Sequence, residues 1–422
     1  MFRASVLFSL TVVCASLQAQ TGSRADLSRL VVVGDSISAG VQNFSLLDTQ
    51  QVHGYASVIA AQANVSLVLP SVPYPGAPNV LQLTSLNPVT IAPVSGSLTA
   101  PRDNPCQQAT NVSVPGVTLE QALTVTPNPA PSADPVQGWA NIVLGFPSPF
   151  GAGLCSNASA TTALTEVQEA VNLNPTAIIE WLGNNDVLVP ALTGALTEIT
   201  PPSTFANEYE QLLSTLQATH ARILTTTIPD VTKIPYFTSL NTISEETHMS
   251  VGTVAQKLGL NPGDLLRETA VPTALSILSG QPAPSTWPAS CPAPPLDLPS
   301  PVPCVLSASD ASNVQNIIDS YNWAIVFESL IHGATVVDIH GLVDELAQDG
   351  YWAGDKHVTL AFLGGIVSLD GIHPTNKGYA IIANEFIEVM NAAWGTQIPP
   401  ANVAEIAAHD PLVPPIKVPT NP

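Results

Sequence analysis

Charged residues are scarce in this chain, and basic residues are the scarcest of all. Its 422 residues include 11 Lys and Arg against 32 Asp and Glu, which gives a formal net charge of −21. No cluster of basic side chains occurs anywhere in the sequence. Nucleic acids and anionic membrane surfaces are therefore poor partners, because both bind proteins through such clusters. The acidity itself favours solubility and says little about function.

Long hydrophobic runs are also rare, and the first twenty residues contain the only prominent one. In "MFRASVLFSLTVVCASLQAQ" one Arg precedes an apolar run from Ala4 to Ala15, and small and polar residues close it near Ala19. This pattern is typical of a secretory signal peptide over residues 1–20. A retained membrane anchor is the alternative, but the run is short for a spanning helix of about 20 residues. We predict a secreted or periplasmic protein with no stable membrane span after the signal is removed.

Cysteine is sparse too, and four of the five cysteines lie beyond the predicted signal peptide. An even number in an exported chain favours disulfides, and four cysteines allow three pairings. We favour Cys106–Cys155 together with Cys291–Cys304, because the second pair would close the Pro-rich loop "CPAPPLDLPSPVPC". A metal site is the weaker alternative, since the chain has no C-x-x-C and no His pair near a cysteine. We expect no metal and no cofactor.

Short apolar runs alternate with helical patterns along the chain. The runs typical of buried parallel strands are Leu30–Val33, Val65–Leu69, Ala177–Leu182, Ile223–Thr227 and Thr335–Ile339. The helical patterns cover Phe205–Leu216, Ile317–Glu328 and Thr375–Trp394. Strands that alternate with helices predict a three-layer α/β/α sandwich with a central parallel sheet of about five strands, which is a flavodoxin-like architecture.

Two connections are too long for simple crossovers. Residues 71–163 and 231–308 each hold one cysteine pair, and the second contains the helical stretch "EETHMSVGTVAQKLGLNPGDLL". Insertions of this length are either lids and binding loops or variable decoration, and both interpretations stay open. The predicted organisation is a signal peptide, one domain over residues 21–400 with these two insertions, and a Pro-rich tail over 401–422. We expect a monomer.

The stretch "VVVGDSISAG" places Ser36 directly after the first predicted strand. Ser36 is either a nucleophile at the strand end or a polar residue in a turn, and these ten residues do not decide. A nucleophilic serine needs a base, and "SLDGIHPTNKGYA" places Asp370 three residues before His373. Such spacing lets one loop present both side chains, with the carboxylate holding the imidazole in the required tautomer. The other seven histidines lack such a partner, and we interpret them as structural or surface residues.

Acyl transfer also needs hydrogen-bond donors for the developing oxyanion. In "EWLGNNDVL", after the third predicted strand, Gly183 permits a tight turn and Asn185 can project its amide. Ligands bind at the carboxyl ends of strands in open α/β sheets, so Ser36 and Asn185 should converge. An ordinary Asn-rich turn is the alternative. The chain has no G-x-S-x-G and no S-x-x-K, which argues against a nucleophile-elbow hydrolase and a β-lactamase.

Four short blocks now stand in a definite order: "GDS" at 34–36, "VPG" at 114–116, "GNND" at 183–186 and "DGIH" at 370–373. This order resembles that of the SGNH hydrolases, also called GDSL esterases and lipases. The resemblance covers the predicted sheet framework and neither insertion. It departs from the family in one detail, because Ile37 follows Ser36 where the family name has Leu.

The resemblance implies a role for each matched residue. Ser36 would be the nucleophile, His373 the general base and Asp370 the acid that orients it. The oxyanion donors would be the backbone N–H groups of Ser36 and Gly116 and the side-chain amide of Asn185. Activity should then fall below about pH 6, because the imidazole must be neutral and the ordinary histidine pKa is ~6.5.

The resemblance also implies a substrate class, which the residues themselves leave open. We predict a secreted esterase or lipase that hydrolyses carboxylic esters, with a small-molecule, lipid or acylated-sugar ester as its partner. One alternative is a carbohydrate O-acetylesterase of the same fold, and a second is a non-catalytic secreted binding protein. The stretches "VPYPGAPNVL" and "TKIPYFTSL" offer apolar side chains for a binding rim, although core packing explains them equally well.

Overall fold

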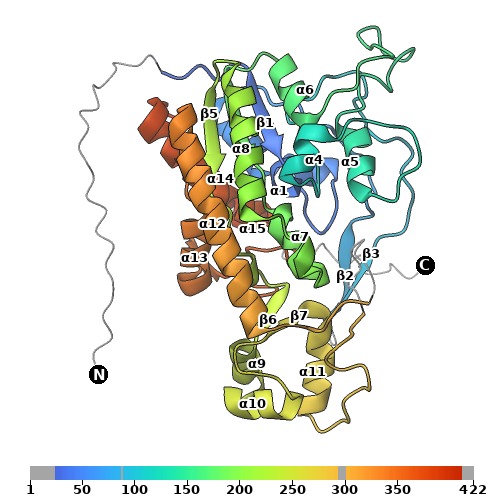
Figure 1. Cartoon of the computed structure of the whole chain (residues 1–422), viewed down its shortest axis with the longest axis vertical. Helices are drawn as coiled ribbons and strands as arrows, with labels where there is room; N and C mark the ends of the chain where they lie inside the picture. Colours follow the sequence, from blue (N-terminus) through green and yellow to red (C-terminus); the bar gives the residue numbers. More distant parts are fainter. Residues whose placement is uncertain (1–23, 87–88, 293–300, 411–422) are drawn as a thin grey trace.

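The computed structural model describes residues 24–86, 89–292 and 301–410, so the predicted signal peptide and the last part of the predicted tail lie outside the described residues. A four-stranded parallel sheet in the order β1-β4-β5-β9 forms the centre of the protein (Figure 1). Its strands are β1 (Leu30–Gly34), β4 (Ala177–Trp181), β5 (Arg222–Thr226) and β9 (Thr335–Val337). Four of the five predicted strands are thereby confirmed.

Helices cover both faces of this sheet, which confirms the predicted sandwich. Successive strand residues point to opposite faces: Val31, Val33 and Ile178 join one buried cluster, and Val32, Ile179 and Trp181 join the other. The three helical patterns predicted from the sequence correspond to α8, α12 and α14. The first face packs against α6 (Glu166–Asn172), α8 (Pro202–Gln217) and α12 (Ala308–His332), and the second against α3 (Tyr55–Ala63) and α14 (Asn376–Trp394).

The predicted strand over Val65–Leu69 is wrong. This segment is extended coil, and the Val68 carbonyl accepts the N–H groups of Thr110 and Asn111 at 2.9 and 3.1 Å. The place beside β1 is instead taken by residues 110–114, which form a single parallel bridge, Val32–Asn111. The run is apolar enough for a strand, but its backbone pairs with this neighbouring segment and not with the sheet. Residues 110–114 thus lead the chain to Gly116 at the carboxyl edge of β1.

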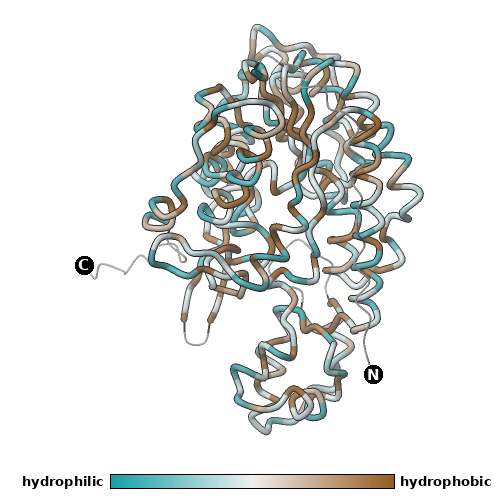
Figure 2. Tube along the Cα trace, turned by 90° about the vertical axis from the view of Figure 1, so that its left-hand side faces the viewer, coloured by the Kyte–Doolittle hydropathy of each residue, from teal (hydrophilic) through white to brown (hydrophobic). Residues whose placement is uncertain are grey.

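The insertion over 231–308 forms a lobe of its own at the lower end of the molecule in Figures 1 and 2. A small antiparallel sheet packs there with three helices around a separate apolar cluster that includes Leu240, Val254 and Leu266. The elements of the lobe are β6 (Phe237–Ser239), α9 (Leu240–Thr247), α10 (Val251–Leu258), β7 (Leu265–Arg267), α11 (Val271–Leu278) and β8 (Val305–Leu306). Cys291 and Cys304 form a disulfide within it.

The described residues of the insertion over 71–163 share their buried apolar clusters with other parts of the chain. The insertion contains a hairpin and two short helices, and Val136 and Ala140 belong to the large buried cluster on the first face. The elements are β2 (Leu81–Leu86), β3 (Val89–Pro93), α4 (Leu119–Thr124) and α5 (Pro135–Val143). Cys106 and Cys155 form its disulfide, so both pairings agree with those favoured from the sequence.

The chain end after α14 folds back onto the sandwich. Residues 401–410, the first part of the predicted Pro-rich tail, contain a helix, α15 (Val403–His409), which packs against α14. A buried ion pair of 2.8 Å between Lys377 and Asp410 secures this return. In the part of the chain that the structure describes, no helix combines the length and apolarity needed to cross a membrane.

Candidate active site

Ser36 lies at the carboxyl end of β1, where the strand turns into the short helix α1 (Ser36–Ala39). Asp35 caps this helix, and its side chain accepts the N–H of Ile37 at 3.0 Å. The cap fixes the turn, and Ser36 is the first residue of the helix. Its half-buried side chain is accessible at the edge of the sheet. A serine in this position can reach a ligand at the carboxyl ends of the strands, where open α/β sheets bind their ligands.

His373 bridges Ser36 and Asp370 from a loop at the other end of the sequence. Its Nε2 lies 2.8 Å from Ser36 Oγ, although the two residues are 337 positions apart. Its Nδ1 lies 2.8 Å from Asp370 Oδ2. With the Nδ1 proton donated to the carboxylate, Nε2 is left to accept the proton of the serine hydroxyl. This is the contact pattern of a serine nucleophile, a base and an orienting acid.

The Asp370 carboxylate is buried but well supplied with donors. Its Oδ1 accepts the backbone N–H groups of Ile372 and His373, each at 2.8 Å, and its Oδ2 accepts the N–H of Phe44 at 2.6 Å. Burial alone would raise the pKa of Asp370. The charge and hydrogen bonds of His373, with the Ile372 N–H, outweigh burial and hold this pKa below its ordinary value. Asp370 is therefore ionised at neutral pH, as an orienting carboxylate must be.

Two loops brace each other around Asp370. The Asn43 side chain accepts the N–H of Leu369 at 3.0 Å, and the N–H of Asn43 donates to the Ser368 hydroxyl at 2.9 Å. Asn43 and Phe44 both have left-handed backbone conformations, with φ of 49° and 54°. This conformation is uncommon for a bulky residue such as Phe, and such residues cluster at active sites and ligand clamps. The lobe also contacts this loop, because the N–H of Tyr236 donates to the Gly371 carbonyl at 3.0 Å.

Asn185 lies at the start of α7 (Asn185–Thr193), directly after the turn that ends β4. The turn requires glycine at 183: φ is 101°, and a Cβ there would lie 2.7 Å from the Phe205 ring. Asn185 Nδ2 lies 3.0 Å from the Val117 carbonyl and 3.4 Å from Asp35 Oδ2. The amide therefore connects the "GNND" turn both to the turn around Gly116 and to the turn around Ser36.

Gly116 has a left-handed backbone, with φ of 78°, and is half-buried beside α5. Among the described residues, no hydrogen bond engages its N–H or that of Ser36. Two free backbone donors next to the Asn185 amide are the groups that an oxyanion needs. The structure thus brings together all five residues predicted from the sequence, Ser36, Gly116, Asn185, Asp370 and His373.

Sequence reasoning missed a second aspartate in this site. Asp35 Oδ2 accepts the side-chain amides of Asn184 at 2.8 Å and Asn185 at 3.4 Å. Burial raises the pKa of Asp35 to about 6, although these donors and the charge of His373 oppose the shift. Asp35 belongs to the "GDS" block, but no feature of the sequence shows that its carboxylate points inward and holds the asparagines.

Buried glutamates lie behind Asp35. Glu166 Oε1 accepts the N–H of Gly34 at 2.6 Å, and Glu180 accepts the N–H of Leu182 at 2.8 Å and the Tyr209 hydroxyl at 2.7 Å. Burial raises the pKa of Glu180 to about 8 and that of Glu166 well above its ordinary value. Burial thus favours the protonated form of both carboxyl groups, which accept backbone N–H groups at the carboxyl ends of β1 and β4.

No family model matches the chain, and no curated protein matches it. Solved structures with a similar course of the chain include an acetylxylan esterase from Geobacillus stearothermophilus, with 10% identity over 88% of this chain and 97% of that one and a TM-score of 0.37. An alpha/beta hydrolase from the Lake Arreo metagenome has 16% identity over 87% and 96%, with a TM-score of 0.37. A lipase/acylhydrolase from Enterococcus faecalis has 12% identity over 88% and 98%, with a TM-score of 0.34.

Proposed function

We propose that this protein is a serine ester hydrolase with Ser36 as nucleophile, His373 as general base and Asp370 as orienting acid. One observation carries the proposal: two contacts of 2.8 Å link Ser36 Oγ to His373 Nε2 and His373 Nδ1 to Asp370 Oδ2. This chain of contacts ends at the carboxyl edge of the sheet, beside the free backbone N–H groups of Ser36 and Gly116. A binding protein without catalytic activity has no need for a hydroxyl aligned on an imidazole that is itself held by a carboxylate.

The first half-reaction forms an acyl-enzyme. His373 Nε2 takes the Ser36 hydroxyl proton as Oγ bonds to the ester carbonyl carbon, and the carbonyl oxygen becomes an oxyanion. The N–H groups of Ser36 and Gly116 and the Asn185 amide stabilise this charge. The Asn185 amide becomes available by giving up its long contact of 3.4 Å with Asp35.

The first half-reaction ends when the carbon–oxygen bond to the alcohol breaks, and the alcohol leaves with the proton from His373 Nε2, which yields the acyl-enzyme. The second half-reaction regenerates the enzyme. Water then gives a proton to the same nitrogen and attacks the acyl carbon, and the acid departs as Ser36 recovers its proton. The chain's own residues supply every group in this cycle.

We further propose that the protein acts outside the cytoplasm. The signal-like sequence of residues 1–20 supports this, and so do the Cys106–Cys155 and Cys291–Cys304 disulfides. Disulfides persist in oxidising compartments and are rare in the cytosol. Expression of the full chain with cell fractionation and N-terminal sequencing of the exported protein tests this proposal; an uncleaved protein in the cytosol would contradict it.

The test of catalysis is hydrolysis of p-nitrophenyl esters from acetate to palmitate by the wild type and by Ser36→Ala. Because the nucleophile is lost, we expect kcat to fall by roughly 10⁴–10⁶. Ser320→Ala is the matched control, since Ser320 is an exposed serine on α12 and should keep full activity. A fluorophosphonate probe should also label Ser36, as read by peptide mass spectrometry. Undiminished hydrolysis by Ser36→Ala would overturn the proposal.

A further inference from the structure

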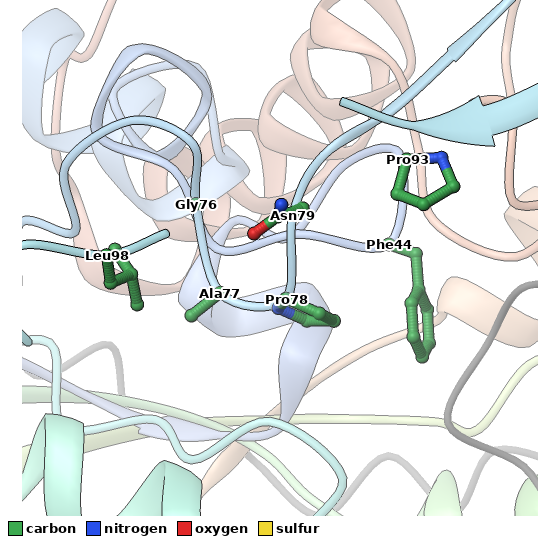
Figure 3. A pocket seen from close by; sticks show the side chains of 7 residues that line it. All are labelled: Phe44, Gly76, Ala77, Pro78, Asn79, Pro93 and Leu98. Carbon is green, nitrogen blue, oxygen red and sulfur yellow. The ribbon is translucent and has the colours of Figure 1, made fainter. Parts of the chain in front are cut away.

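A cavity of about 440 Å³ lies between Phe44 and the insertion over 71–163 (Figure 3). Phe44, residues 76–79, Pro93 and Leu98 line it. Its volume falls within the range of about 300–1,000 Å³ that is typical of small-molecule sites. No charged side chain lines it, and Asn79 is its only polar side chain. A cavity of this composition accommodates an uncharged, apolar group.

Hydrogen bonds connect the residues that line the cavity to neighbouring segments of the chain. Asn79 Nδ2 donates to the carbonyls of Val94 and Gly96 at 2.8 and 3.0 Å, so the amide donor serves the wall. Ala77 and Leu46 exchange two backbone hydrogen bonds of 2.9 and 3.0 Å. These contacts join the segment that follows Ser36 to the insertion over 71–163. The cavity therefore belongs to the fixed framework of the site.

Two of the cavity residues also contact the catalytic framework. Phe44 donates its N–H to Asp370 at 2.6 Å, and Figure 3 shows its ring on the cavity side of the loop. Ala77 packs in one buried cluster with Ala39 and Val41, which directly follow the Ser36 turn. The cavity thus adjoins the Ser36 segment through Ala77 and the Asp370 loop through Phe44. These two links make the cavity the candidate site for one part of a substrate that reacts at Ser36.

We infer that this cavity holds the acyl group of the ester, so that the substrates are esters of apolar carboxylic acids longer than acetate. This inference rests on the proposed function and names its substrate class. The acyl group is the part that needs a fixed site, because it stays bonded to Ser36 through both half-reactions while the alcohol leaves after the first. An acetyl group would leave most of the cavity empty, which disfavours acetylated sugars as the main substrates.

Acyl chain length is the variable that tests the inference. For the wild type we expect kcat/KM on p-nitrophenyl esters to rise from acetate to hexanoate by roughly fourfold for each methylene that enters the cavity. Leu98→Trp fills the cavity and should lower kcat/KM on hexanoate by about tenfold or more, with less than about a threefold change on acetate. Phe44→Ala keeps the backbone N–H to Asp370 but removes the ring, and should flatten the rise with chain length.

Two matched controls separate this effect from a general loss of folding. Leu330→Trp and Phe327→Ala change the same residue types on α12, where both side chains are exposed and distant in sequence from the cavity. Both should keep the chain-length profile of the wild type. Circular dichroism melts of all four variants report whether each one folds.

The outcomes distinguish the inference from the proposed function. If Leu98→Trp and Phe44→Ala lower acetate and hexanoate hydrolysis equally, or leave both unchanged, the cavity does not bind the acyl group. A series of alkyl acetates with lengthening alcohols provides the second arm: if these variants change alcohol selectivity and not acyl selectivity, the acyl assignment is wrong. Ester hydrolysis that persists in Ser36→Ala, or wild-type protein that hydrolyses no ester, contradicts the proposed function instead.

Discussion

Asp35 and Asp370 are both buried in the candidate active site, yet the pKa of Asp35 is raised and that of Asp370 is lowered. Asp370 accepts three backbone N–H groups and the His373 ring, and its pKa is held below the ordinary value. Asp35 accepts one backbone N–H and two side-chain amides, one of them at 3.4 Å, and its pKa is raised to about 6. The same buried side chain thus has its pKa shifted upward in one environment and downward in the other.

The difference shows that donors and a cationic partner, more than exposure, decide the charge of a buried carboxyl. Asp370 directly contacts the His373 imidazole, which becomes positively charged in the proposed reaction, so the negative charge of Asp370 would stabilise that state. Asp35 touches neutral amides, and its charge in turn raises the pKa of Glu166 and Glu180. We therefore assign Asp370 to catalysis and Asp35 to holding Asn184 and Asn185 in place.

The largest expected effect is on kcat, and it comes from making the same isosteric substitution, Asp to Asn, at each of the two aspartates. Asp370→Asn should lower kcat by about 10⁴, because the amide favours the wrong imidazole tautomer. Asp35→Asn keeps the shape of the site and, since its charge is not needed for proton transfer, should lower kcat by less than about tenfold. Steady-state kinetics on one ester with both variants measures the contrast. Equal losses would refute the division of roles.

The next effect tests the asparagines that Asp35 holds. Asn185→Ala removes a proposed oxyanion donor and should lower kcat by about 10²–10³. Asn184→Ala is the matched control: it removes the shorter contact with Asp35, 2.8 Å, but no donor to the oxyanion. We expect it to lower kcat by less than about tenfold. If Asn184→Ala proves as damaging as Asn185→Ala, the oxyanion role of Asn185 loses its support.

The smallest effect is on stability and has opposite signs for the two aspartates. A raised pKa in the folded state means that the stability contributed by Asp35 is complete below its unfolded pKa of 3.8 and is lost as pH rises through about 6. Asp370, with its lowered pKa, contributes stability above 3.8 that is lost as pH falls through its folded pKa. Between about pH 4 and 6 the free energy of unfolding should therefore decline on account of Asp35.

Asp35→Asn should remove part of that decline. The shift from 3.8 to about 6 corresponds to an upper limit of about 3 kcal/mol at about 1.4 kcal/mol per pKa unit. Urea unfolding at pH 4.5, 5.5 and 6.5, without reductant, measures the slope for the wild type and the variant. Asp370→Asn serves as the reference and should leave the slope in this range unchanged. A wild-type slope in Asp35→Asn would mean that Asp35 is ionised throughout.

The fold was predictable where a strand is buried on both faces. Leu30–Val33 and Ala177–Leu182 are continuous apolar runs, and each forms a buried strand of the parallel sheet. Val65–Leu69 has the same character but pairs with residues 110–111, which the sequence does not reveal. Apolar composition predicts burial, whereas pairing depends on which segment the rest of the chain brings alongside.

The residues of the candidate site were predictable where their side chains indicate the chemistry. Ser36, Asn185, Asp370 and His373 stand at strand ends or before a helix, in short blocks that bring the right side chains. Phe44 could not have been identified in this way, because its contribution to Asp370 is a backbone N–H and its φ of 54° is unusual for its type. A backbone donor carries no signature in the sequence.

The sequence by itself determined which reactive side chains the protein has and at which strand ends they stand, because local apolar patterns and turn residues set those positions. Only the tertiary structure decided that Ser36 and His373 meet at 2.8 Å across 337 positions, that the pKa values of Asp35 and Asp370 shift in opposite directions, and that Phe44 borders a cavity of about 440 Å³. Distances, desolvation and cavities arise from contacts between remote segments, so they are properties of the packed molecule.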